Sequence, residues 1–435
     1  MKKNNHRGMS AGTILMLAFV FLVLGGSILV LSRLSSRKSV DLTKLSMQTL
    51  NLETRETEQL SDSQAEHAQQ AFPTAAVQPV RTAAPEVRKA GFSLTVGGTL
   101  AFSGELRKNS YLSESKMYDY TDTLQLIRNE FNADVNIVFL ENLLSDDAKV
   151  NDTVAPGYTA DVLKNAGIQY AACGFAKAFD QGDAGIAATE KILQSRGIRV
   201  LGIIADQAES SIRMAEYGGV KAAFLQYTGT VSSAVRKSME KKGIGNQVPA
   251  AEAERIAEDI RLAREQGAEA VIVLLQWGKA GKAADKNQKA LAQQIADAGA
   301  DLIIGSGSRI PQGIERLNAA DPRGGIRHVL CVWDPGCLMT GDRSSGIKRM
   351  AGYLFHITLR KMEDGSIAAE HGSWTPVYTW KYKQDGRFYY RCLPADGPVP
   401  DGMDSEQQKL MQRAQDAVTE ALKNAPDLEG EAAAG

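Results

Sequence analysis

Two separate segments of the sequence carry side chains that could bind an anion. Residues 305–309 read Gly-Ser-Gly-Ser-Arg, and Lys177 lies in a different loop. Lysine and arginine make charge-assisted hydrogen bonds to phosphate and carboxylate, and the backbone N–H groups of a glycine-rich turn can cradle the same ligands. Ser306, Ser308, Arg309 and Lys177 are therefore candidates for an anion pocket. The alternatives are that the two cations are ordinary surface residues and that the Gly-Ser segment is a flexible turn.

Carboxylate, amide and aromatic side chains follow other apolar runs. Glu141 and Gln276 each end a β-type run, Trp277 comes next, and Asp180 precedes a helical segment. Trp277 could stack on a sugar ring through its apolar face or pack in the core. Glu141 and Asp180 fit helix caps or hydrogen-bond anchors better than catalysts, so we assign no catalytic residue. The pocket candidates are Glu141, Lys177, Asp180, Gln276, Trp277, Ser306, Ser308 and Arg309.

The elements that must position these residues alternate between two types. Short β-type runs lie at residues 92–96, 137–140, 200–204, 222–225, 270–275, 301–305 and 328–332. Helical composition separates some of them, at 252–266 and 288–298. This alternation predicts an α/β domain whose ligand sites lie on loops after the strands. Three later runs, at 353–359, 372–380 and 387–392, have no long helix between them and predict antiparallel strands.

The two ends of the chain differ from this domain. Residues 10–32 contain no charged side chain and are long enough for a membrane-spanning helix. We predict a cytoplasmic head (1–11), an uncleaved transmembrane signal anchor (12–32), a low-complexity stalk (33–90), the large extracytoplasmic domain (91–400), and a C-terminal helix with a disordered tail (401–435). A cleaved signal peptide is the alternative for the anchor. The last helix is expected at residues 406–423, capped by Asp404 and Ser405.

A longer pattern resembles a known family. Residues 297–305 read Asp-Ala-Gly-Ala-Asp-Leu-Ile-Ile-Gly and 309–315 read Arg-Ile-Pro-Gln-Gly-Ile-Glu, after Trp277-Gly278 and a Gln-x-x-Leu-Ala segment at 288–292. This order resembles the CapA family of bacterial capsule and poly-γ-glutamate synthesis proteins, and segments 133–141 and 178–186 match its earlier motifs. The resemblance covers about residues 92–394. It implies a metallophosphoesterase-type α/β sandwich of the calcineurin-like superfamily.

The chain departs from this family where metals would bind. A two-metal phosphoesterase needs Asp, Asn and His side chains around its cations. The replacements at the family's ligand positions are Gly98, Phe139, Phe175, Ala176, Lys177, Gln276, Ala280 and the segment 305–309. None of the five histidines, His6, His67, His328, His356 and His371, stands at such a position. We therefore expect no metal, no cofactor and no competent metal-dependent phosphoesterase.

The resemblance implies participation in capsule or poly-γ-glutamate synthesis or export at the cell surface. The first hypothesis is a non-catalytic binding or scaffold subunit. The others are a metal-independent hydrolase that uses Lys177, Arg309 and Asp180, and a surface-polymer sensor. Expected partners are an anionic surface polymer or its synthase and export subunits, and the membrane. Nucleic acid is not expected, because 50 Lys and Arg residues balance 51 Asp and Glu residues.

The four cysteines, Cys173, Cys331, Cys337 and Cys392, have no zinc-site spacing. In a large domain such residues are typically buried and apolar in behaviour. Cys331 and Cys337 bracket the segment Trp-Asp-Pro-Gly at 333–336, and a disulfide between them is the alternative to two free thiols.

Overall fold

The computed structural model describes residues 90–428 except 322–323 and 343–345. The expected head, anchor and stalk, and the expected tail from residue 430, lie outside these residues. Within the described part of the chain, no helix is long and apolar enough to cross a membrane.

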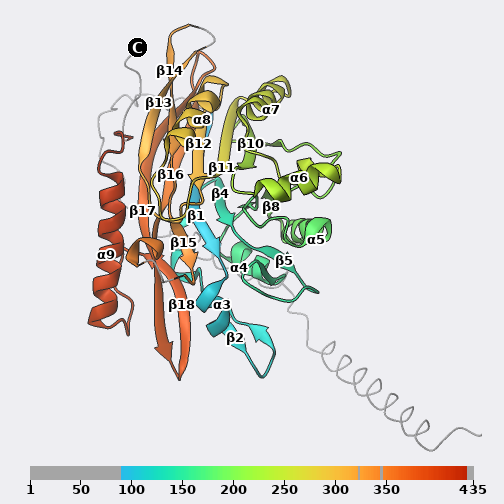
Figure 1. The fold of residues 1–435 in the computed structure, drawn as a ribbon. Helices are drawn as coiled ribbons and strands as arrows, with labels where there is room; N and C mark the ends of the chain where they lie inside the picture. Colours follow the sequence, from blue (N-terminus) through green and yellow to red (C-terminus); the bar gives the residue numbers. More distant parts are fainter. Residues whose placement is uncertain (1–89, 322–323, 343–345, 429–435) are drawn as a thin grey trace, which may run out of the picture. The chain divides into compact units, whose positions relative to one another are not determined.

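The larger sheet has the strand order β18-β17-β16-β1-β4-β7-β8, and β15 also pairs with β1 (Figure 1). Its strands β1, β4, β7 and β8 run parallel to one another, whereas β16, β17 and β18 add antiparallel pairs. The strand bounds are β1 Gly91–Ala101, β4 Val135–Leu140, β7 Tyr170–Ala172, β8 Arg199–Leu201, β15 Cys337–Thr340, β16 Ala351–Lys361, β17 Ile367–Gln384 and β18 Arg387–Pro394. The antiparallel strands predicted late in the chain are therefore confirmed.

The second sheet has the order β13-β14-β12-β11-β10-β9. Strands β10, β11, β12 and β14 are parallel, and β9 and β13 close the edges in antiparallel fashion. Its bounds are β9 Arg213–Tyr217, β10 Val220–Thr228, β11 Ala270–Gln276, β12 Leu302–Ser306, β13 Ile314–Ala320 and β14 Ile326–Val332. Two short pairs lie apart from both sheets: β2 Tyr111–Leu112 with β3 Met117–Tyr118, and β5 Leu143–Ser145 with β6 Val154–Pro156.

Apolar side chains fill the space between the two sheets. Leu94 and Val96 of β1 belong to the same buried cluster as Phe224 of β10 and Ile272 of β11. Because successive strand residues point to opposite faces, the other residues of these strands face outward and need a cover. The two sheets therefore pack face to face, as the predicted α/β sandwich requires.

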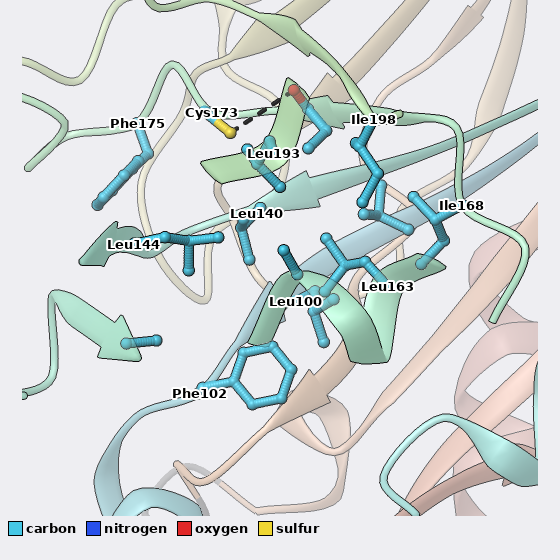
Figure 2. Packing of buried hydrophobic residues seen from close by; sticks show 14 of the residues in the cluster. Leu100, Phe102, Leu140, Leu144, Leu163, Ile168, Cys173, Phe175, Leu193 and Ile198 are labelled. Carbon is cyan, nitrogen blue, oxygen red and sulfur yellow. Dashed lines mark hydrogen bonds between the residues drawn. The ribbon is translucent and has the colours of Figure 1, made fainter. Parts of the chain in front are cut away.

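Helices cover the outer faces of both sheets. On the larger sheet, Leu100 and Leu140 pack with Leu163 of α4 and Leu193 of α5 (Figure 2). On the second sheet, α7 and α8 contribute to a separate outer cluster. The helix bounds are α3 Gly104–Ser110, α4 Thr159–Asn165, α5 Gly182–Ser195, α6 Ser233–Lys241, α7 Ala253–Glu265, α8 Lys286–Asp297 and α9 Ser405–Leu422, with 3₁₀ turns η1 Gln125–Glu130, η2 Gly245–Gln247 and η3 Ile347–Arg349.

The C-terminal helix α9 lies within one residue of its predicted position. The Asp404 side chain accepts from the Gln407 backbone N–H, and the Gln407 side chain accepts in return from the Asp404 backbone, which forms a capping box. Val418 and Leu422 of α9 join the cluster between the sheets. The helix therefore belongs to the packed domain.

Candidate functional site

Polar side chains from both sheets meet at the carboxyl ends of the strands. Glu141 follows β4, Gln276 ends β11, and Ser306, which ends β12, is paired with Gln276 in the β11–β12 register. The Thr99 hydroxyl of β1 lies 3.1 Å from the Ser306 hydroxyl and donates to Glu141 Oε1 at 3.3 Å. This contact joins the two sheets at one polar point.

Glu141 and Arg309 form an ion pair at this point. Only 4 % of the Glu141 side chain is exposed, against 32 % of the Arg309 side chain. Burial lowers the pKa of Arg309, but attraction by Glu141 outweighs it, so the pKa of Arg309 is raised overall. The guanidinium of Arg309, a candidate for binding an anion, is thus paired with a carboxylate of the protein itself.

Both polar atoms of the Gln276 side-chain amide make hydrogen bonds. Its Nε2 donates to Glu141 Oε1 at 3.4 Å, and its Oε1 accepts from the Thr228 hydroxyl at 3.2 Å and from the Thr230 hydroxyl. The residue is 5 % exposed. These contacts fix its amide orientation and leave it little freedom to bind another group.

The Asp334 carboxylate fixes the loop that carries Ser308 and Arg309 through several hydrogen bonds. Its Oδ2 accepts from the Ser308 backbone N–H and hydroxyl, both at 2.7 Å, and from the Arg309 N–H at 3.2 Å, while Oδ1 accepts from the Gly336 N–H at 2.7 Å. Arg309 is held at a φ of 58°, in the left-handed region. Burial raises the pKa of Asp334 to about 7, although these hydrogen bonds oppose the shift. The sequence analysis did not identify this residue.

Trp277 packs in the core. It is 4 % exposed, its ring stacks on Trp333 at 5.6 Å with an interplanar angle of 25°, and its Nε1 donates to the Trp333 carbonyl at 3.1 Å. Its face is therefore closed to a sugar ring, and the core position is confirmed.

Lys177 and Asp180 lie in an exposed turn before α5. The N-cap of α5 is Gln181, without a side-chain cap hydrogen bond, so Asp180 as a helix cap is wrong. Within the described residues, neither Lys177 nor Asp180 makes a hydrogen bond or ion pair with the Glu141–Arg309 pair. The structure thus gathers Glu141, Gln276, Ser306 and Arg309, with Ser308 in the same loop, but does not join Lys177 or Asp180 to them.

The residues present do not fit a two-metal centre. A β-carbon on Gly98 would overlap the Gly336 carbonyl, and one on Gly305 would overlap the Trp277 ring. The guanidinium of Arg309 already neutralises Glu141. In the part of the chain that the structure describes, no group of three or more His, Cys, Asp or Glu side chains could hold a metal ion.

The four cysteines are free and buried. Burial raises the pKa of Cys173, Cys331, Cys337 and Cys392 well above its ordinary value. The alternative of a Cys331–Cys337 disulfide is wrong, and the thiols behave as packing groups.

The fold and site define a two-sheet α/β protein whose polar centre is closed by an internal ion pair. Residues 93–325, just over half of the 435-residue chain, match the family model described as "Bacterial capsule synthesis protein PGA_cap". The chain belongs to this family, which confirms the resemblance drawn from its motifs.

Two further comparisons complete these findings. A search of curated proteins gave no match. Among solved structures, the chain is similar to the calcineurin-like phosphoesterase YfkN from Bacillus subtilis, with 13 % identity, a TM-score of 0.38, and coverage of 77 % of this chain and 100 % of that chain.

Proposed function

We propose that this protein takes part in capsule or poly-γ-glutamate synthesis or export as a membrane-anchored, non-catalytic binding or scaffold subunit outside the cytoplasm. Family membership supports the process. The observation that supports a non-catalytic role is the Glu141–Arg309 ion pair, which lies where the family resemblance implies metal-binding residues. A positively charged side chain that is bound to the remaining carboxylate supplies neither an open coordination site nor an activated water.

The rewired hydrolase has less support. It requires Lys177, Asp180 and Arg309 to act on one substrate, but Arg309 is paired with Glu141 and the other two side chains make no contact with that pair. Nucleophilic and acid–base catalysis both need side chains within hydrogen-bonding reach of one another. A binding role needs no such arrangement.

The proposal of a membrane anchor is supported by the sequence. The uncharged residues 10–32 have the length that a spanning helix requires, and the polar segment that follows is suited to a stalk. Anchoring would keep the domain beside membrane-bound synthase or export subunits.

Deletion and complementation in the source bacterium test the process. Loss of the gene should remove or shorten the capsule, and the parent gene should restore it. Wild-type amounts of capsule in the deletion strain would contradict the proposal.

An assay of the full chain in detergent tests the non-catalytic role. Phosphomonoester and phosphodiester substrates should show no turnover above buffer with added Mn²⁺ or Zn²⁺, and chelator should leave the melting temperature unchanged. Metal-dependent turnover that disappears in Glu141→Gln would overturn the non-catalytic role.

A further inference from the structure

Four polar side chains form a continuous line of hydrogen bonds on the outer face of the larger sheet. Because its neighbours in β1 face the second sheet, Thr95 points to the opposite face. Its hydroxyl lies 3.0 Å from Nδ1 of His356 on β16, and Nε2 of the same ring lies 3.1 Å from the Thr375 hydroxyl of β17. The Thr375 hydroxyl donates to Glu130 Oε2 of η1 at 3.1 Å. We call these four side chains the His356 relay.

The direction of each hydrogen bond in the relay follows from the carboxylate at its end. Thr375 donates its one hydroxyl proton to Glu130, so its oxygen must accept from Nε2–H of His356. A neutral imidazole with its proton on Nε2 has none on Nδ1, which therefore accepts from the Thr95 hydroxyl. The relay thus fits the neutral form of His356 in one tautomer.

A second proton on the ring would disturb this order. An imidazolium donates from both nitrogens, so Thr95 could no longer donate to Nδ1 and its own proton would need another acceptor. Thr95 is 1 % exposed, and within the described residues its hydroxyl has no other hydrogen-bond partner. A buried donor without a partner costs free energy. The surroundings of His356 therefore oppose its protonation.

The pKa of His356 agrees with this geometry. Burial lowers the pKa below its ordinary value of 6.5, and attraction by Glu130 raises it by a smaller amount. The folded state therefore holds the proton less tightly than the unfolded state, and the contribution of the relay to stability is complete above about pH 6.5. This contribution decreases as the pH falls from there through the lower pKa of the folded state.

Other titratable groups face the relay from each neighbouring element. From the loop after η1, the Asp134 carboxylate accepts two hydrogen bonds from one serine of β1, at 2.8 Å each. From β17, Glu370 pairs with Arg360 of β16 at 2.6 Å, and the exposed His371 lines the same groove of about 380 Å³ as the relay. Among these groups and Glu130, only Glu130 makes a hydrogen bond within the relay in the described part of the chain.

We propose that the His356 relay is an acid-sensitive switch in the larger sheet, in which uptake of one proton breaks the side-chain contact between β1 and β16. These two strands join the parallel half of the sheet to its antiparallel half, so the switch acts at the junction of the two halves. The relay shares no residue with the Glu141–Arg309 pair, and the inference does not depend on a role in capsule synthesis.

Urea unfolding of the full chain in detergent at a series of pH values tests the switch. His356→Gln keeps a donor for Thr375 and an acceptor for Thr95 but has no titrating proton. The urea midpoint of the parent should therefore fall relative to that of His356→Gln as the pH is lowered from about 7.5 to about 5. Asp334 is present in both proteins, so its own pH dependence cancels in this comparison.

Two further variants and a local measurement sharpen the test. Glu130→Gln removes the attraction that favours the imidazolium and should enlarge the loss of stability in acid. His328→Gln changes an exposed histidine of β14 and should keep the pH dependence of the parent. Amide hydrogen exchange should show that protection of β16 falls more in the parent than in His356→Gln at the acid end of the range.

Three results would overturn the inference. The first is a parent that loses no more stability in acid than His356→Gln. The second is an equal loss of pH dependence in His328→Gln. The third is a smaller acid loss in Glu130→Gln than in the parent, and this comparison decides the matter if His356→Gln does not fold.

Discussion

The ion pair between Glu141 and Arg309 is the central contact of the candidate site. The Glu141 carboxylate is almost fully buried, and among the residues that the structure describes it keeps the Thr99 and Gln276 donors when the guanidinium is removed. Because an unpaired buried charge is costly and Arg309 is partly exposed, Arg309→Ala should lower the free energy of unfolding by about 1–3 kcal/mol. Urea denaturation measures this change.

Two variants control this measurement. Adding Glu141→Gln to Arg309→Ala should recover part of the loss, because the amide carries no charge. Arg261→Ala, in an exposed pair on α7, should have a much smaller effect. Equal stability of parent and Arg309→Ala would show that the pair does not hold the site together.

Asp334 makes stability depend on pH. Its folded pKa of about 7 lies above its ordinary value of 3.8, so the folded state holds a proton that the unfolded state has lost. Its contribution is therefore complete below about pH 4 and decreases as the pH rises towards 7. The difference in unfolding free energy between the parent and Asp334→Asn should decrease over this range and stay level above it. Urea titrations at a series of pH values measure this difference, and a constant difference would contradict the assignment.

Part of this site could be predicted from the sequence. Glu141, Gln276 and Ser306 each lie at the carboxyl end of a predicted strand, and the ends of parallel strands share one edge of a sheet. Asp334 could not be predicted, because its role depends on which backbone N–H groups lack partners in the folded loop. Lys177 was chosen from its motif position, which does not determine where a long exposed side chain points.

Among the elements, helix α9 is stabilised by the hydrogen bonds of its first turn. Asp404 accepts from the Gln407 N–H, and Gln407 in turn accepts from Trp380 Nε1 at 3.0 Å and donates to the Lys381 carbonyl at 3.1 Å. Loss of an N-cap side chain typically costs about 1 kcal/mol, so Asp404→Ala should destabilise the domain by about that amount. Thermal and urea denaturation should agree on the change.

The control for this prediction is Asp401→Ala, which changes an exposed carboxylate in the preceding turn. It should leave stability unchanged within error. If both variants lose equal stability, general charge rather than the cap is responsible.

In the second sheet, the strands with two buried faces were predicted from the sequence, and the two edge strands were not. The apolar runs at 270–275 and 301–305 became β11 and β12, whereas the half-exposed β9 and β13 show no continuous apolar run. The first strand was expected at residues 92–96 but continues through Gly97 and Gly98 to Ala101. Position 98 inside this strand is a glycine because the Gly336 backbone approaches too closely for a side chain.

On the scale of the whole molecule, the division of the strands into two packed sheets could not be predicted from the local pattern of apolar residues. Parallel strands of both sheets carry the same continuous apolar runs, so their sequences do not show which strands share a sheet. The two-sheet sandwich was predicted from the family resemblance. The buried cluster that contains Val96 and Ile272 shows the packing that stabilises it.

Membrane topology is the prediction that concerns the entire chain. We expect residues 12–32 to span the membrane once, with the domain that begins near residue 91 outside the cytoplasm. Lys2, Lys3 and Arg7 before the span are balanced by three cations after it, so charge asymmetry does not set the orientation, and the short head favours an inside N-terminus.

Protease added to intact protoplasts tests this topology. The large domain should be removed while a cytoplasmic marker survives, and detergent lysis should expose both. A variant with two arginines inserted among residues 18–24 should no longer span, because charge at the centre of a helix opposes insertion by about 2.5–3.5 kcal/mol per residue. That variant should lose membrane retention or export. A parent domain that survives protease on sealed protoplasts would show that the domain faces the cytoplasm, and this result would contradict the proposed location outside it.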